Sequence, residues 1–317
     1  MTEKKSVVAQ AAAKKKASRG KQADANSPAR LSRRVILWRR FRRNKTALVG
    51  AVGLGIIVMI ALFAPYLSKW DYTVPDQTAF LKPPSAQHWF GTDPGGFDMF
   101  AMTIEGLRKS LLIGFAVAAI QTTIAAFVGA SAAYFGGWFD RVTLWVVDLL
   151  LVIPSFLIIA VLAHSTGKAS GSVWMLILLL GAFGWMLSSR VVRSLTLSVR
   201  TLDYVTAAKY MSVPAFSIIT KHILPNISSL LIIDATLGVA SAVLAETTLS
   251  YFGFGVQAPE VSLGTLISYG QARATTHPWL FMPPAAVLTL ALVCVNFVGD
   301  GVRDALDPSS KSAGGNA

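Results

Sequence analysis

Cysteine and charged residues are both scarce in this 317-residue sequence. The single cysteine, Cys294, excludes an intrachain disulfide and any cysteine cluster that would hold a metal. Only 14% of the residues are charged, whereas a soluble domain carries about 25%. Because 53% of the residues are hydrophobic and the mean hydropathy is +0.54, the composition favours a membrane protein over a soluble protein with buried helices.

Sequence motifs for covalent or nucleotide chemistry are also missing. The chain has no G-x-x-x-x-G-K-[ST], H-E-x-x-H, C-x-x-C or G-x-S-x-G pattern. The stretch TGKAS at 166–170 lacks the upstream glycine of a phosphate-binding loop, and the four histidines show no metal-ligand spacing. We therefore predict no catalytic residue, no cofactor and no metal site in this chain. Any energy for work would come from a partner protein or an ion gradient.

Positive charge is concentrated near the N-terminus. Residues 1–45 contain 15 lysines and arginines but only two acidic residues, whereas the rest of the chain is neutral overall. The excess therefore precedes the first apolar stretch, and basic residues that flank a span stay on the cytoplasmic side. This pattern predicts a cytoplasmic N-terminus in contact with membrane lipid, and it does not indicate nucleic-acid binding.

Six stretches are long and apolar enough to be spanning helices, which need roughly 20 residues each. They lie at about 46–67, 111–134, 142–163, 173–187, 229–245 and 279–298. If the connecting segments alternate between the two sides, those on the inner side hold 23 of the 29 lysines and arginines. The sequence therefore predicts an all-α membrane protein with six transmembrane helices and both termini in the cytoplasm.

These spans suggest how the chain is organised. Arginines alternate with Leu31, Val35, Trp38 and Phe41, which fall at helical spacing before the first span. We predict six segments: a disordered basic tail (1–29), an amphipathic interfacial helix (30–45), a first transmembrane helix (46–67), an extracytoplasmic loop (68–105), a transmembrane core (106–302) and a cytoplasmic tail (303–317).

The longest predicted internal loop contains the stretch YVTAAKYMSVPAFSIITKHILPN, residues 204–226. A proline disfavours helix in the residue before it, so Pro214 predicts a break near 212–214 between two short helices, 205–211 and 215–224, the second ending at Pro225. Ala207 and Ala208 would offer a thin contact surface, and the lysines would suit an acidic rim. The loop either docks into a groove on another protein or lies on the membrane surface.

Three acidic residues fall within or near the ends of predicted spans, where charge is costly and usually faces a cavity or a partner. Asp148 is expected either to form an ion pair or to line a pathway. Asp234 is a candidate for the pathway or a subunit contact. Glu246 lies near a span end and is expected to be an anchor, with an intersubunit or pathway role as the alternative.

The internal loop resembles the EAA loop of binding-protein-dependent ABC importer permeases. Ala207, Ala208 and Ile223–Pro225 match that pattern, whereas Thr206 stands where it often has an acidic residue and Ser212 where it has glycine. A serine costs more than glycine if that residue has a positive φ. The resemblance extends over about residues 33–308 through FGTDPGGFDMFAMTIEGLRKSL, AYFGGWFD, LSYFGFGVQAPEVSLGTLI and GDGVRDALDP, and it is nearest to the second permease subunit of oligopeptide and dipeptide importers.

This resemblance implies the fold and the partners. It implies a type I ABC importer transmembrane domain in the cytoplasmic (inner) membrane of a prokaryote. The partners would be a second homologous permease, two ATPase subunits or one fused ATPase that bind ATP and Mg, and an extracytoplasmic solute-binding protein. The loop 202–225 would couple the ATPases to alternating access, through Val205, Ala207, Ala208, Lys209, Ser212, Pro214, Leu224 and Pro225.

The cargo implied by the resemblance is a peptide. The same architecture would also serve for nickel chelates, haem or another small solute. An ion-coupled secondary transporter is a more distant alternative, which predicts paired inverted repeats and does not explain the alanine loop.

Overall fold

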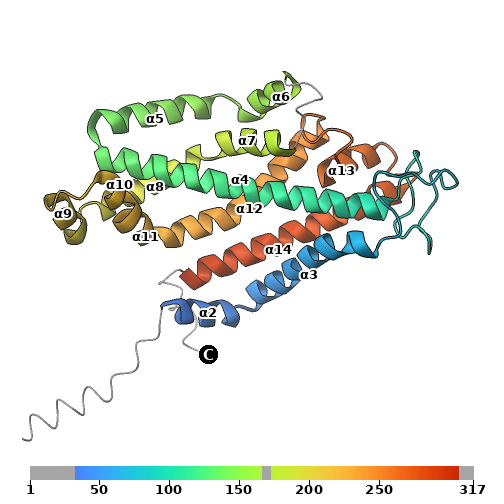
Figure 1. Ribbon diagram of the computed structural model, residues 1–317, viewed down its shortest axis with the longest axis horizontal. Helices are drawn as coiled ribbons and strands as arrows, with labels where there is room; N and C mark the ends of the chain where they lie inside the picture. Colours follow the sequence, from blue (N-terminus) through green and yellow to red (C-terminus); the bar gives the residue numbers. More distant parts are fainter. Residues whose placement is uncertain (1–32, 166–172, 307–317) are drawn as a thin grey trace, which may run out of the picture.

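The computed structural model describes residues 33–165 and 173–306, and these form an elongated bundle of helices (Figure 1). Its elements are α2 (Arg33–Arg43), α3 (Lys45–Leu67), α4 (Met99–Phe135), α5 (Gly137–Val152), α6 (Ser155–Ser165), α7 (Val173–Gly184), α8 (Met186–Val199), α9 (Asp203–Tyr210), α10 (Ala215–Ile218), the π-helix η1 (Ile219–Ile223), α11 (Leu224–Asn226), α12 (Ser228–Tyr251), α13 (Leu263–Gln271), the 3₁₀-helix η2 (Pro278–Leu280) and α14 (Met282–Leu306).

Four of the described helical segments are each long and apolar enough to cross a membrane: α3, α4, α12, and η2 with α14. Two further candidates are bent pairs, α5 with α6 at 74° and α7 with α8 at 44°. The described chain is thus all-helical with four to six candidate spans. The third and fourth predicted spans are not single straight helices, because Pro154 follows the end of α5 and the chain bends at Trp185.

Helix α4 corrects the predicted boundary of the second span. The Asp98 side chain caps the helix by accepting a hydrogen bond from the Ala101 N–H (2.7 Å), so α4 begins at Met99. The helix therefore includes the last part of the predicted loop 68–105 as well as the predicted span 111–134. It ends at Gly136, whose φ of +65° favours glycine.

The ends of the chain differ from the predicted segments in small ways. Helix α2 occupies 33–43 within the predicted interfacial helix 30–45. Its Phe41 lies against Gly301 of α14, and Arg40 donates a hydrogen bond to the Ala305 carbonyl (3.4 Å). Helix α14 runs to Leu306, into the predicted tail 303–317. The predicted tail 1–29 lies outside the described residues.

Small residues let the helices of the bundle approach closely. A Cβ added to Gly129 of α4 would lie 2.4 Å from the Ser189 carbonyl oxygen of α8. A Cβ added to Gly53 of α3 would lie 2.6 Å from the buried Cys294 Sγ of α14. Glycines at such contacts are typical of helices that associate in a membrane by van der Waals packing.

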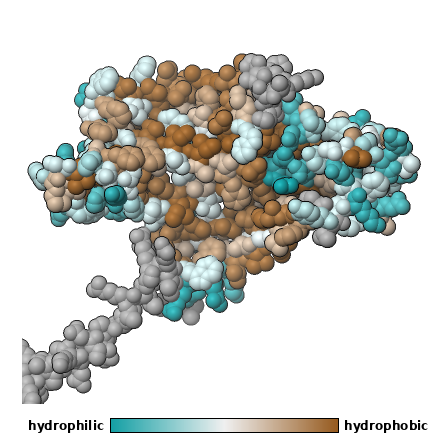
Figure 2. Space-filling view, viewed as in Figure 1, coloured by the Kyte–Doolittle hydropathy of each residue, from teal (hydrophilic) through white to brown (hydrophobic). Residues whose placement is uncertain are grey.

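An apolar band crosses the middle of the molecule, and hydrophilic residues gather toward the two ends of its long axis (Figure 2). The irregular segment 68–98 lies at one end, and α9 lies at the opposite end (Figure 1). The band exposes large apolar side chains such as Trp145, Leu178 and Phe63. Exposure of so many large apolar groups is expected where lipid replaces water as the solvent.

Candidate functional site

The segment between α8 and α12 folds as a helix, a tight turn and a second, irregular helix. Val205 and Ala208 of α9 are buried, each 2% exposed. They belong to one apolar cluster with Ile218, Ile219 and Ile223 of the second helix. Because the same cluster includes Ala130 of α4 and Val192 of α8, the segment packs both on itself and on these two helices.

Ser212 closes the turn after α9 with a φ of +57°. Its N–H donates to the Lys209 carbonyl (3.1 Å), and the Val213 N–H donates to the Ala208 carbonyl (3.1 Å). These two bonds form a Schellman cap, in which the residue in the left-handed conformation is usually glycine. The break predicted near 212–214 is confirmed, and Ser212 carries the strain expected of a serine at positive φ.

Two adjacent alanines point in different directions. Ala207 and Lys209 are exposed, whereas Ala208 is buried against the chain's own core. The expectation that both alanines form one contact surface is therefore wrong for Ala208. Tyr210 and Met211 were not predicted to take part. They are 86% and 71% exposed and extend the exposed surface formed by Ala207 and Lys209.

The second helix does not stop at Pro225 as predicted. The chain adopts a π-turn over Ile219–Ile223, in which the Leu224 N–H reaches back to the Ile219 carbonyl. A proline lacks the N–H for an α-helical bond and its ring clashes with the preceding turn, and the π-turn ends two residues before Pro225. Leu224 is partly buried, and the exposed Pro225 lies within the short helix α11. Pro214 is the residue that precedes the first turn of α10.

Polar contacts join α4, α5 and α8, the helices around the segment between α8 and α12. Arg193 of α8 donates two hydrogen bonds of 2.5 Å to the Asp140 carboxylate of α5. Arg200 donates to the Ala133 carbonyl near the end of α4. A bidentate guanidinium–carboxylate pair fixes both distance and orientation. The ends of α4, α5 and α8 nearest the loop are therefore held together.

The three acidic candidates lie in three different environments and do not come together. Asp148 of α5 forms an ion pair with Arg190 of α8, and both side chains are substantially exposed. Asp148 therefore makes the basic contact that was one of its two predicted roles.

Glu246 is fully buried, with 0% exposure. Its carboxylate accepts hydrogen bonds from Ser110 Oγ of α4 (3.0 Å) and from Ser250 Oγ of α12 (2.7 Å). Ser110 Oγ also accepts the Leu263 N–H at the start of α13 (3.3 Å). This cluster links α4, α12 and α13 inside the chain, and the anchoring role of Glu246 stays a prediction.

Asp234 of α12 faces a cavity of about 320 Å³ between α4, α8 and α12. One carboxylate oxygen accepts from Ser188 Oγ (2.7 Å) and the other from Thr122 Oγ1 (3.2 Å). A pathway residue should border such a cavity, so this position is compatible with the predicted role.

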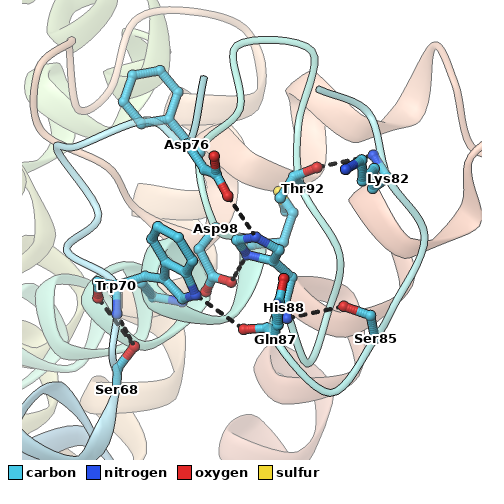
Figure 3. Close-up of polar contacts among 12 residues, drawn as sticks. Ser68, Trp70, Asp76, Lys82, Ser85, Gln87, His88, Thr92 and Asp98 are labelled. Carbon is cyan, nitrogen blue, oxygen red and sulfur yellow. Dashed lines mark hydrogen bonds and ion pairs between the residues drawn. The ribbon is translucent and has the colours of Figure 1, made fainter. Parts of the chain in front are cut away.

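The irregular segment 68–98 carries a buried polar cluster at the opposite end of the molecule (Figure 3). His88 is 2% exposed, with Nδ1 2.8 Å from an Asp98 oxygen and Nε2 3.4 Å from an Asp76 oxygen. The Trp70 ring stacks on the His88 ring, with centroids 4.6 Å apart. Asp98, which caps α4, is thereby joined to the rest of the segment.

The Asp93 carboxylate organises the turn just before this capping residue. It accepts hydrogen bonds from the N–H groups of Gly95 and Phe97, both at 2.8 Å. It also accepts a hydrogen bond from the Tyr269 hydroxyl of α13 (3.4 Å). Burial raises the pKa of Tyr269, and the negative charge of Asp93 raises it further. The GTDPGGFD stretch therefore forms a turn that the Asp93 carboxylate stabilises by hydrogen bonds and that leads into α4.

Comparisons with known proteins define the class. Residues 121–312 match the model of the binding-protein-dependent transport system inner membrane component. Residues 32–84 match the N-terminal TM domain of oligopeptide transport permease C. The chain belongs to the family of binding-protein-dependent transport system inner membrane components, and it is a multi-pass transport permease rather than a catalytic enzyme.

Individual relatives are similar over nearly their whole length. The oligopeptide transport system permease protein OppC of Mycobacterium tuberculosis (strain ATCC 25618 / H37Rv) is 52% identical over 281 residues, which cover 89% of this chain and 96% of the relative. OppC of Bacillus subtilis (strain 168) is 35% identical, with coverages of 90% and 94%. The dipeptide transport system permease protein DppC of the same strain is 35% identical, with coverages of 92% and 90%.

Proposed function

We propose that this chain is a permease subunit of a bacterial ABC importer and that it forms, with a second homologous permease, the pathway for oligopeptides. The observation that carries the proposal is the segment 202–226 between α8 and α12, here called the loop 202–226, which forms helix, turn and helix with an exposed tip at one end of the apolar band (Figure 2). The similarity to oligopeptide permeases over nearly the full length of both chains supports a peptide cargo over haem or nickel chelates.

The proposed topology has six spans, with each bent pair counted as one, in a type I importer fold. The basic helix α2, the loop 202–226 and the end of α14 lie toward one end of the long axis, and the segment 68–98 lies at the other (Figure 1). Since basic residues stay on the inner side, the first end faces the cytoplasm and the second faces outward. Both termini are then cytoplasmic.

The proposed coupling acts through the exposed tip of α9. ATP and Mg bind to partner ATPases, and closure of those subunits presses on Ala207, Lys209, Tyr210 and Met211. The packed core beneath the tip, which includes Val205 and Ala208, passes the displacement to α4 and α8. A solute-binding protein delivers the peptide at the opposite end, beside the segment 68–98.

A matched pair of substitutions at neighbouring alanines tests this proposal. In a strain that lacks the gene, we expect wild type to restore uptake of labelled di- to octapeptides. Ala207→Asp places a charge on the exposed tip, so the permease pair should assemble normally while ATPase co-purification and uptake are lost. Ala207→Ser, which adds no charge, should restore uptake.

Substitution of Ala208, the buried neighbour of Ala207, should give a different phenotype. Ala208→Asp leaves an unpaired charge in the core of the loop, which costs roughly 3–5 kcal/mol and should lower the amount of folded permease itself. Normal uptake by Ala207→Asp would contradict the coupling role. Uptake of haem or another solute, but not of peptides, would contradict the cargo and leave the architecture standing.

A further inference from the structure

Among the described residues, the Asp234 carboxylate is held in place by neutral groups alone. Ser188 Oγ donates to one oxygen at 2.7 Å and Thr122 Oγ1 donates to the other at 3.2 Å. These donors come from α8 and α4, so the carboxylate on α12 is oriented from two sides. A neutral hydroxyl orients a carboxylate but does not neutralise its charge, which is costly inside a membrane protein.

The basic side chains of α8 are engaged elsewhere. Arg190 pairs with Asp148 and Arg193 pairs with Asp140, both on α5. Arg200 donates to a carbonyl of α4. Within residues 33–165 and 173–306, Asp234 is in no ion pair, and no lysine or arginine lines its cavity. The cavity thus contains an acid without a basic counterpart from the described chain.

The cavity has the shape and chemistry of a small binding site. Its volume is about 320 Å³, within the range of roughly 300–1,000 Å³ that ligand pockets occupy. Leu187, Leu230, Ile233 and Leu237 supply apolar walls around the carboxylate. One fixed anionic group among apolar walls suits an organic cation, because the walls accept an aliphatic stem while the carboxylate accepts the ammonium or guanidinium hydrogens.

We propose that the cavity between α4, α8 and α12 lies on the transport pathway and that Asp234 makes it a binding site for the cationic group of a peptide in transit. The inference rests on the proposed function as a peptide permease. The cation is an ammonium or guanidinium group, and it can come from the peptide's N-terminus or from a lysine or arginine side chain. Peptides that carry this group gain a contact in the cavity that neutral peptides lack.

The test compares peptides of equal length in proteoliposomes that contain the full transporter and its binding protein. Uptake of trialanine, alanyl-lysyl-alanine and N-acetyl-trialanine is measured for wild type and for Asp234→Asn, which keeps the size of the side chain. The preference of the binding protein is the same for both permeases and cancels when the uptake ratios are compared. Ser241→Ala alters the same cavity wall without changing charge and serves as the matched control.

Each outcome decides the proposal. If a side-chain cation binds, Asp234→Asn lowers the uptake of alanyl-lysyl-alanine relative to trialanine by roughly five-fold. If the N-terminal ammonium binds, the variant instead lowers trialanine relative to its acetylated form by a similar factor. Ser241→Ala should change neither ratio.

Other results would overturn the inference. If wild type imports peptides and neither ratio changes in Asp234→Asn, the cation site is wrong while the proposed function stands. If Asp234→Asn releases the second permease during purification, the carboxylate holds the two subunits together and does not serve the cargo. If wild type imports no peptide at all, the proposed function fails and the inference fails with it.

Discussion

Replacement of Ser212 by glycine should stabilise the loop 202–226. Ser212 has a φ of +57°, and the left-handed conformation costs a residue with a Cβ roughly 1–2 kcal/mol. Glycine avoids this cost but loses more backbone entropy on folding, which takes back roughly 0.5–1 kcal/mol. The two hydrogen bonds of the Schellman cap come from backbone N–H groups and remain. The net gain for Ser212→Gly therefore lies between about 0 and about 1.5 kcal/mol and centres on about 0.5–1 kcal/mol.

Amide hydrogen exchange measures this change directly, because the N–H groups of Ser212 and Val213 are the donors of the cap. A gain of about 0.5–1 kcal/mol in local stability slows their exchange by roughly two- to five-fold when exchange follows local opening. Ser217→Gly makes the same chemical change inside α10, where glycine is a poor helix former, so it should speed exchange of the second helix. Peptide uptake by Ser212→Gly should be retained.

The direction of the change in amide exchange tests whether Ser212 carries backbone strain. Ser212→Val places a β-branched residue at the same positive φ and should speed exchange at the cap. If Ser212→Gly speeds exchange as Ser217→Gly does, then Ser212 carries no backbone strain. In that case the Schellman geometry is not what ends α9.

Two further predictions concern the other polar clusters. Glu246→Leu leaves the Ser110 and Ser250 hydroxyls without their acceptor, so it should lower the unfolding free energy of the detergent-solubilised complex by roughly 2 kcal/mol or more. Glu246→Gln should cost less, because an amide keeps an acceptor. Equal thermal stabilities of the two variants would contradict the anchoring role. Hydrogen bonds from Thr78, and to a smaller extent the contact with His88, lower the pKa of Asp76. Ionised Asp76 therefore stabilises the segment 68–98 fully above the unfolded pKa of about 3.9, and this stabilisation is lost as the pH falls through the lower folded value. The protection factor of the Thr78 amide, which corrects for the slower intrinsic exchange in acid, should therefore fall in that acid range, and Asp76→Asn should remove this pH dependence.

Apolar runs were enough to predict where the helices of the bundle lie. All six predicted stretches fall on helices, because roughly 20 apolar residues with few charges have few other ways to satisfy their backbone groups in lipid. The bend after Ile153 could have been predicted from Pro154, which disfavours helix in the residue before it. The start of α4 could also have been predicted, since Asp98 is a favourable N-cap residue.

The orientation of α9 was beyond sequence reasoning. The helix has only eight residues, and small side chains at Ala207 and Ala208 give no apolar periodicity that distinguishes inside from outside. Which alanine is buried depends on Ile218 and Ile223, which come from the far side of the turn. The cluster around His88 is likewise set by tertiary contacts, because Asp76 and Asp98 flank it at distances in sequence that follow no regular period.

Helix α4 joins the two ends of the molecule without a break. Its 37 residues contain no proline and span about 55 Å. At one end, its capping residue Asp98 is bonded to His88 in the segment 68–98. At the other end, Ala130 packs in the core of the loop 202–226, and the Ala133 carbonyl accepts from Arg200.

Two other connections are bent, whereas α12, which begins directly after the loop 202–226, is unbroken. The chain bends by 74° between α5 and α6 and by 44° between α7 and α8. In the proposed coupling, a load on the loop 202–226 would pass along the unbroken helices α4 and α12, while the bends at Pro154 and Trp185 would flex. Since Asp234 is held by Thr122 of α4 and Ser188 of α8, a relative movement of these two helices changes the support of the carboxylate itself. The proposed cation site and the proposed opening motion would thus be linked through the same two hydroxyl groups.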